Sequence, residues 1–96
     1  MIRHIVLYWL KDPSRIEETI GVLTSMEGKI PGLLKIEAKP DTLRSERSCD
    51  LCLHTVFENR EALNAYRKHP AHIPVRQYMH GVIVNSASAD VEVDAI

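Results

Sequence analysis

Apolar and polar residues alternate along the chain in two rhythms. A strand repeats every second residue and a helix about every 3.6 residues, so the rhythm distinguishes the two elements. The segment 4–10 is β-branched, aromatic and apolar on both faces, which predicts a central strand covered on each side. Strand patterns also occupy residues 33–38, 49–57 and 87–93. We therefore expect four strands.

Three of these segments also predict which residues share a face. In the second strand, one face carries Leu34, Ile36 and Ala38. In the third, one face carries Leu51, Leu53, Thr55 and Phe57, and the other carries Cys52, His54 and Val56. The fourth strand alternates Ala89, Val91 and Val93 with Asp90, Glu92 and Asp94.

The first helical block lies between the first two strands. Asp12-Pro13 is typical of a helix start, because the carboxylate caps free N–H groups and proline fits the first turn. Residues at helical spacing then follow at Ile16, Ile20, Leu23, either Met26 or Glu27, and Ile30. Pro31-Gly32 is expected to end this helix.

The second helical block follows the third strand. Asn59 is a good N-cap for a helix through Lys68, and a proline break then separates it from a helix over 71–84. The run 81–84 could alternatively begin a strand, and periodicity alone does not decide between the two.

The order β-α-β-β-α-β predicts an α+β, ferredoxin-like fold, in which both helical blocks cover one face of an antiparallel four-stranded sheet. The other face of a monomeric sheet should be polar, yet the first strand carries apolar residues on both sides: Ile5, Leu7 and Trp9 on one, Val6, Tyr8 and Leu10 on the other. The simplest cover for a second apolar face is another copy of the chain. We therefore expect a homodimer through the sheet face, forming a barrel.

Composition and charge narrow the function. The 96 residues make one domain, 1–96, and 12 Lys and Arg balance 13 Asp and Glu for a net charge of -1. No basic field is available for a nucleic acid or an anionic membrane. The longest apolar run, residues 5–10, is too short to span a bilayer, and residues 1–4 do not resemble a signal peptide. We expect a soluble, cytoplasmic protein without nucleic-acid or membrane partners.

The richest candidate chemistry lies in residues 65–72, Ala-Tyr-Arg-Lys-His-Pro-Ala-His. Because His69 precedes Pro70, the helix should stop there, and a second can start near His72. Tyr66 and His72 could then line a cavity at this corner, although such residues are also common as surface or cap residues at helix ends.

Metal, redox and nucleotide chemistry find little support. Residues three apart on a strand face opposite ways, so Cys49 and Cys52 are expected to be two reduced thiols. His69 and His72 could chelate a metal with His4 or His80, but no carboxylate cluster accompanies them and Pro70 prevents a shared helical face. The chain has no phosphate loop or dinucleotide fingerprint, so we expect no cofactor and no metal.

Several motifs together resemble the stress-responsive A/B barrel domain family. They are Ile2–Lys11, Ile30-Pro31-Gly32, Asp50–Glu58 and Ala62–His72, and they follow the family's order over nearly the whole chain. The resemblance implies the ferredoxin-like fold and a dimer whose sheets form a barrel. It also implies that residues 82–84 belong to the long last helix.

The resemblance fixes the fold better than the function, and two hypotheses follow. The first is a small dimeric barrel, in a stress-related or accessory role, that binds a hydrophobic or aromatic molecule near His4, Tyr8, His54 and His69. The second follows a plant polyketide cyclase of this family, whose Tyr–His pair matches Tyr66 and His72, with His4 as a further pocket histidine. His72 would then be the general base and Tyr66 would hydrogen-bond that base or the developing enolate. Whether His72 lines a closed pocket or reaches bulk water separates the two hypotheses.

Overall fold

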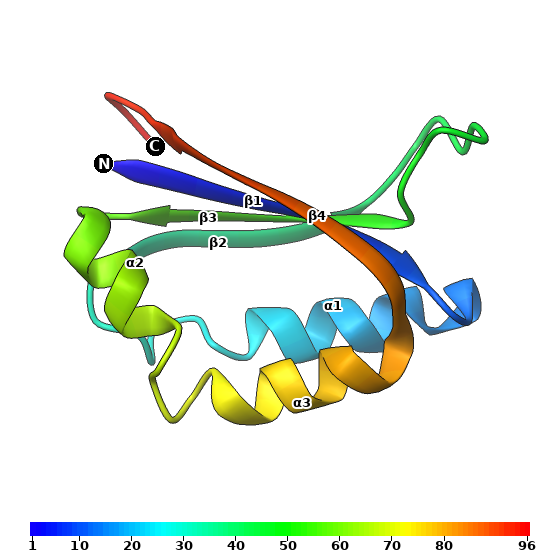
Figure 1. Cartoon of the computed structure of the whole chain (residues 1–96), viewed down its shortest axis with the longest axis horizontal. Helices are drawn as coiled ribbons and strands as arrows, with labels where there is room; N and C mark the ends of the chain where they lie inside the picture. Colours follow the sequence, from blue (N-terminus) through cyan, green and yellow to red (C-terminus); the bar gives the residue numbers. More distant parts are fainter.

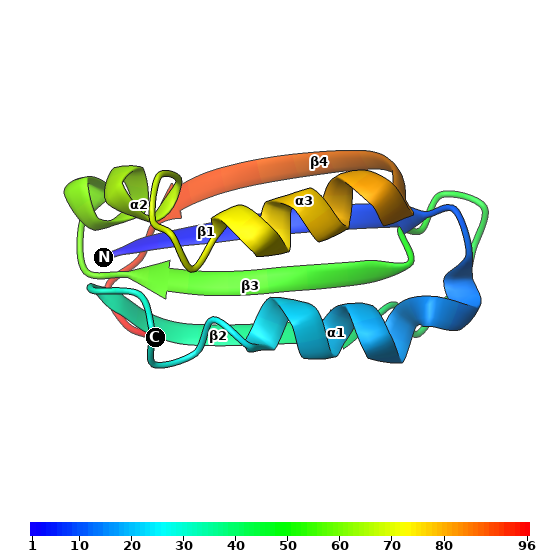
Figure 2. The ribbon, with the colours of Figure 1, turned by 90° about the horizontal axis from the view of Figure 1, so that it is seen from below.

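A computed structural model describes all 96 residues as one sheet with helices on a single face (Figure 1). The elements are, in order, β1 (Ile2–Leu10), the 3-10 helix η1 (Pro13–Arg15), α1 (Ile16–Thr24), β2 (Leu33–Pro40), β3 (Leu51–Phe57), α2 (Arg60–Tyr66), α3 (Ile73–Val82) and β4 (Ile83–Glu92). The strands pair antiparallel in the order β2-β3-β1-β4. Viewed from the helical side, α1 and α3 run along the sheet (Figure 2). The predicted α+β ferredoxin-like fold is confirmed.

The helix-covered face of β3 forms the centre of the core. Leu51, Leu53, Thr55 and Phe57 are each at most 1% exposed, as the period-two pattern predicted. The one polar member, Thr55, donates its hydroxyl hydrogen to the carbonyl oxygen of His4 at 2.9 Å, so its burial leaves no unpaired group.

The first helical block begins where expected but is shorter. Asp12 caps η1 by accepting the N–H of Ser14 at 3.1 Å. Regular helix ends at Thr24 rather than at Pro31, and turns follow, with Gly28 at φ 77°. Glycine adopts this conformation without strain, so the chain can leave the helical path there. Ile30 is nevertheless buried, which explains why its spacing resembled a continued helix.

Gly32 allows α2 to approach the start of β2. Its φ is 79°, and a Cβ at this position would lie 2.6 Å from the Cβ of Ala62. Both observations exclude a larger residue, so this glycine fixes how closely the helix packs at its turn.

The prediction that Leu34 shares the buried face of β2 is wrong, because the pairing of β2 with β3 is irregular at this position. Leu33 lies opposite Phe57 and Lys35 opposite Val56, so the register shifts between them. Ile36 and Ala38 are buried as expected, whereas Leu34 is 42% exposed. A shifted register moves a side chain off its predicted face.

The expectation that the last helix continues through residues 82–84 holds only for Val82, where α3 ends, and is wrong for residues 83 and 84. Ile83 has extended backbone angles, φ -93° and ψ 146°, and it begins β4 opposite Leu10. The N–H of Lys11 donates to the carbonyl oxygen of Val82 at 2.9 Å, which anchors the switch from helix to strand. β-branched residues favour a strand once a partner strand is available.

The sheet face opposite the helices is uncovered within the chain. A shallow hollow on it is lined by Ile5, Leu7, Ala87, Ser88 and Ala89. Beside the strands, the indole N–H of Trp9 donates to the carbonyl oxygen of Ser48 at 3.0 Å. None of the helices has the length and apolar character needed to cross a membrane.

Candidate functional site

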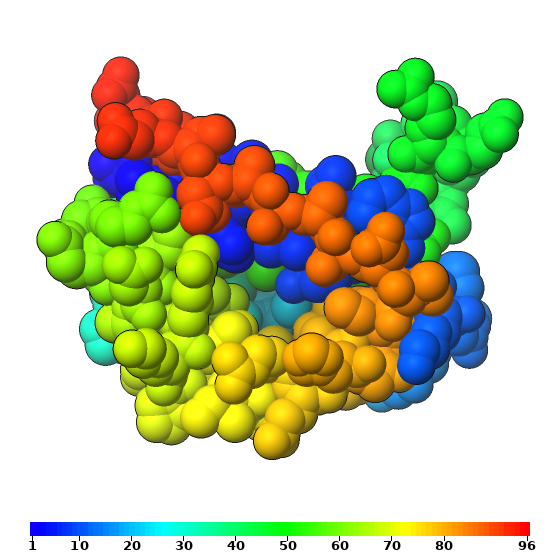
Figure 3. All heavy atoms as spheres, viewed as in Figure 1, coloured from blue at the N-terminus to red at the C-terminus, as the bar shows by residue number.

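A cavity of about 200 Å³ lies between α3 and the β1–β4 side of the sheet. The space-filling view shows the surface hollowed between the last helix and the last strand (Figure 3). The cavity is lined by side chains from α1, α2, α3, β1, β4 and the turn before α3: Tyr8, Leu23, Tyr66, His72, Val75, Arg76, Met79, His80, Ile83 and Ser86. Its wall is thus mainly apolar, with a small number of polar groups.

The break between α2 and α3 brings Tyr66 and His72 together. α2 ends at Tyr66, and the turn that follows is held by the His72 N–H, which donates to the carbonyl oxygen of His69 at 2.9 Å. The Tyr66 and His72 ring centroids are then 4.3 Å apart, with the rings tilted by 33°. Tyr66 also packs 5.0 Å from the ring of Phe57, so the core fixes its position.

The surroundings of His72 favour the neutral form of its imidazole. Burial lowers its pKa, and the positive charge of Arg76 contributes a smaller effect in the same direction. Its Nδ1 lies 3.4 Å from the carbonyl oxygen of Arg67. A carbonyl only accepts, so this contact favours the tautomer with the proton on Nδ1 and leaves Nε2 with a free lone pair.

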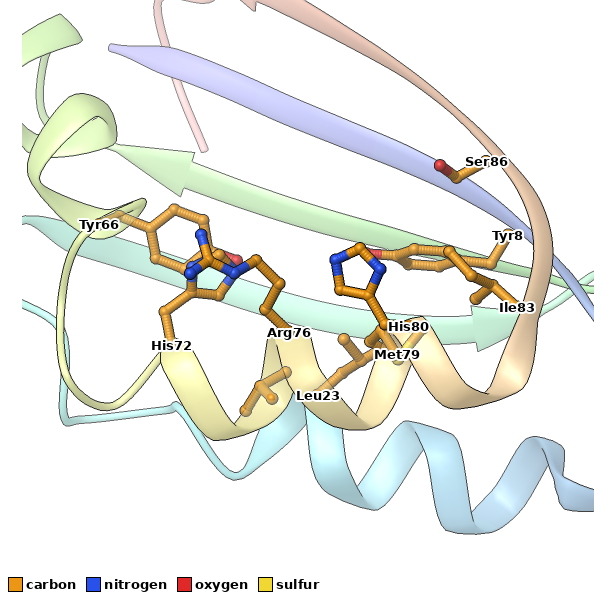
Figure 4. Close-up of a pocket in the computed structure, with 10 residues that line it drawn as sticks. Tyr8, Leu23, Tyr66, His72, Arg76, Met79, His80, Ile83 and Ser86 are labelled. Atoms are coloured by element: carbon orange, nitrogen blue, oxygen red, sulfur yellow. The ribbon is translucent and has the colours of Figure 1, made fainter.

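The two tyrosines offer hydroxyl groups that are protonated and free. Burial raises the pKa of Tyr8 to about 12, and burial also raises the pKa of Tyr66. Both residues are largely buried, neither hydroxyl bonds within the chain, and no buried polar side-chain atom lacks a partner, so both hydroxyls are open to the cavity. Figure 4 shows them pointing toward its middle from opposite ends.

A charged cluster lies beside Tyr66, around the carboxylate of Asp90. His4 Nδ1 is 2.5 Å from Asp90 Oδ1, while Arg60 and Arg67 lie 3.3 and 3.4 Å from Oδ2. The hydrogen bond from His4 is the main cause that lowers the pKa of Asp90. The His4 ring packs edge-on against the Tyr66 ring, with 6.4 Å between centroids, so the charged cluster is in contact with the tyrosine through His4.

The model of the stress responsive A/B barrel domain family matches residues 2–93. The chain belongs to this family. No curated protein matches the sequence.

Several solved structures share the fold of this chain. A protein of Arabidopsis thaliana has 22% identity and a TM-score of 0.84, with 100% of this chain and 98% of that one covered. A dimeric protein of unknown function with a ferredoxin-like fold from Bacteroides fragilis has 22% identity and a TM-score of 0.83, covering 96% and 95%. A dabb family protein from Mesorhizobium loti, also ferredoxin-like, has 22% identity and a TM-score of 0.73, covering 98% and 97%.

The A/B barrel domain gathers some of the predicted site residues and separates others. Tyr8, Tyr66 and His72 line the cavity. His4 lies directly behind Tyr66, on the same side of the sheet. His54 does not share the cavity, because alternation along β3 places it on the opposite face, with Nε2 3.3 Å from Cys52 Sγ.

His69 also lies outside the lining of the cavity. Its Nδ1 accepts the N–H of Ala71 at 3.0 Å, so its ring is used to shape the turn between α2 and α3. His80, considered above only as a possible metal ligand, is exposed and lines the edge of the cavity.

Sequence reasoning missed two site residues, Asp90 and Arg76. A signal existed for each. Asp90 belongs to the polar set of an alternating strand, and only its pairing opposite His4 reveals its role. Arg76 lies four positions from both His72 and His80, a spacing that places all three on one side of a helix.

The geometry suits binding and proton transfer more than metal chemistry. No group of three or more His, Cys, Asp or Glu side chains is placed to hold a metal ion. Both cysteines are free. What the cavity offers is a neutral imidazole, two hydroxyl donors and an apolar wall.

Proposed function

We propose that this A/B barrel domain is a homodimer that binds a small hydrophobic or aromatic molecule in the cavity between α3 and the sheet. The observation that carries the ligand is the cavity itself, with an apolar wall and two unpartnered hydroxyls, Tyr8 and Tyr66. Ligand sites in proteins typically combine such a wall with a few convergent polar groups.

The size of the cavity limits the ligand. An apolar cavity of about 150 Å³ can hold benzene. The present cavity, about 200 Å³, therefore suits a molecule with one ring or a short branched chain. Larger molecules would extend past Ser86 and His80, two lining residues that are exposed at the surface.

The homodimer is supported by the uncovered sheet face and by the relatives. Ile5, Leu7, Ala87 and Ala89 present apolar groups there, and the Bacteroides fragilis relative is described as dimeric. A second copy laid on this face would remove these groups from water.

Native mass spectrometry of freshly purified protein tests both parts. We expect the mass of two chains plus a reproducible small-molecule increment. The Ser86→Trp variant, which fills the cavity opening, should lose the increment and keep the dimer, whereas Ser45→Trp in the exposed loop should keep both. An increment that survives Ser86→Trp would place the ligand elsewhere, and a single-chain mass would remove the dimer.

A second candidate, acid–base catalysis without a cofactor, is favoured by the contact between Tyr66 and the neutral His72. His72 Nε2 would take a proton from a carbon next to a carbonyl. The C–H electron pair would become the enolate double bond, and the developing oxyanion would accept a hydrogen bond from Tyr66. His72 is half-buried and lines the cavity, which supports its role as such a base.

Proton exchange in D₂O tests this candidate. Acetophenone carries one ring and exchangeable methyl protons next to its carbonyl. Catalysed exchange that is lost in His72→Gln and kept in His54→Gln, on the opposite sheet face, would support a base role for His72. Equal exchange rates in all three proteins would remove His72 from the mechanism.

A further inference from the structure

Three basic side chains form a row along the cavity side of α3. His72 is the N-cap residue with helical backbone angles, and Arg76 and His80 follow at intervals of four. Residues four apart on a helix are neighbours on one face. All three line the cavity, next to the apolar pair Val75 and Met79, whose side chains point into the core.

The charge of Arg76 has no internal partner. Arg60 and Arg67 share the carboxylate of Asp90, whereas Arg76 forms no ion pair within the chain. No aspartate or glutamate is among the ten lining residues. The cavity therefore presents an uncompensated positive charge at its edge (Figure 4).

The two tyrosine hydroxyls of the cavity favour a negatively charged ligand, as the charge of Arg76 does. The hydroxyls of Tyr8 and Tyr66 remain protonated and bond to nothing within the chain, so both can donate. Donors outnumber fixed acceptors in this lining, and an anion is the ligand that accepts from all of them.

We infer that the ligand is an anion, specifically a single-ring aromatic carboxylate, and that Arg76 selects it. This inference rests on the proposed ligand-binding function. The ring would lie against Val75, Met79 and the ring of Tyr8, and the carboxylate would meet the guanidinium, whose planar fork matches its two oxygens. Because Arg76 is exposed, water screens its charge, and the expected preference is moderate.

Benzoate and benzamide provide a matched pair of probes, since they have nearly the same shape and differ in charge. Titration of the ¹⁵N-labelled full-length protein, followed by NMR, should show shifts at Tyr8, Met79 and Ser86. Benzoate should bind about tenfold more tightly than benzamide. In Arg76→Gln that preference should disappear, because the loss of the guanidinium weakens binding of the charged benzoate more than that of benzamide.

Arg47→Gln is the control, because it makes the same charge change on an exposed loop residue without an ion pair. It should retain the preference for benzoate. Benzamide binding as tightly as benzoate, or a preference that survives Arg76→Gln, would overturn the inference and leave the proposed cavity function intact. Absence of shifts with either probe would overturn both.

Discussion

The two faces of the sheet carry different kinds of side chain, although one strand supplies both. From β1, His4 and Tyr8 project toward the helices, where they meet Asp90 and the cavity, while Ile5 and Leu7 project the other way. The helical side thus holds buried polar groups and a partly open cavity, and the other side holds a shallow apolar surface. Strand alternation would let a single β1 contribute to the proposed binding site on one face and to the proposed dimer surface on the other.

This separation has a consequence for experiment. A substitution on one face should change one property and leave the other intact, because the two sets of side chains do not touch. Four measurements can probe the two faces separately, and substitution in the core is expected to have the largest effect.

Leu53→Ala removes a side chain that is 1% exposed at the centre of the helix-covered face. We expect it to lower the free energy of unfolding by about 3 kcal/mol, through lost apolar burial and the cavity left behind. Urea denaturation at fixed protein concentration measures this. Leu43→Ala, at a side chain that is 77% exposed, is the control and should change stability by less than about 0.5 kcal/mol. Equal losses in the two variants would contradict a core on this face.

Leu7→Arg places a charge in the middle of the open face. In a symmetric dimer each copy would bring one arginine, so we expect the dissociation constant to rise about a hundredfold, or about 2.7 kcal/mol. Sedimentation over a range of concentrations measures this shift. Leu43→Arg, in the exposed loop, should leave association unchanged. A Leu7→Arg protein that remains as dimeric as the parent would show that this face is not the contact surface.

The alternation of β3 illustrates what local pattern can predict. Leu51, Leu53, Thr55 and Phe57 occupy the predicted face, because a regular antiparallel strand has only two faces and one of them is covered. Leu34 could not be placed in this way, since the register shift beside it depends on pairing with β3. The switch to a strand at Ile83 likewise depends on pairing with β1, which periodicity does not contain.

In the candidate site too, some contacts follow from local sequence and others depend on long-range strand pairing. Tyr66 and His72 are six positions apart around a proline, so their proximity follows from local backbone restrictions. His4 and Asp90 are separated by 86 positions, and only the pairing of the first and last strands brings them together. Local sequence therefore found the corner of the site and missed the carboxylate that supports it.

Asp90→Asn tests the polar cluster of the helix-covered face. Because the folded chain lowers the pKa of Asp90, its ionised form stabilises the fold above the ordinary aspartate pKa, about 4. Loss of charge-assisted bonds to His4, Arg60 and Arg67 should cost about 1–2 kcal/mol at pH 7. As pH falls through the lowered folded-state pKa, the parent loses this stabilisation and the two proteins should converge.

Thermal or urea unfolding at pH 7 and pH 3 measures this difference. Glu92→Gln, two residues along the same edge strand and without an ion pair, is the matched control and should unfold like the parent at both pH values. A constant gap between Asp90→Asn and the parent across this range would mean that the carboxylate charge is not the source of the stabilisation.

The smallest effect concerns the titration of His72 at the cavity. Burial, with the Arg76 charge as a lesser cause, lowers the pKa of its imidazole, so its NMR titration midpoint should lie below the ordinary value of about 6.5. The unfolded chain binds this proton more readily, so the contribution of His72 to stability is complete above pH 6.5. It falls as pH drops from there toward the folded-state pKa. Arg76→Gln should raise the His72 midpoint part of the way toward the ordinary value, because it removes the positive charge but leaves the burial. Arg47→Gln, in an exposed loop, should leave the midpoint unchanged. A midpoint at or above the ordinary value would contradict the lowered pKa of His72. A midpoint above about 7 would mean that the imidazole is mostly charged at neutral pH, and the cavity would then lack the free base on which the proton-transfer candidate depends.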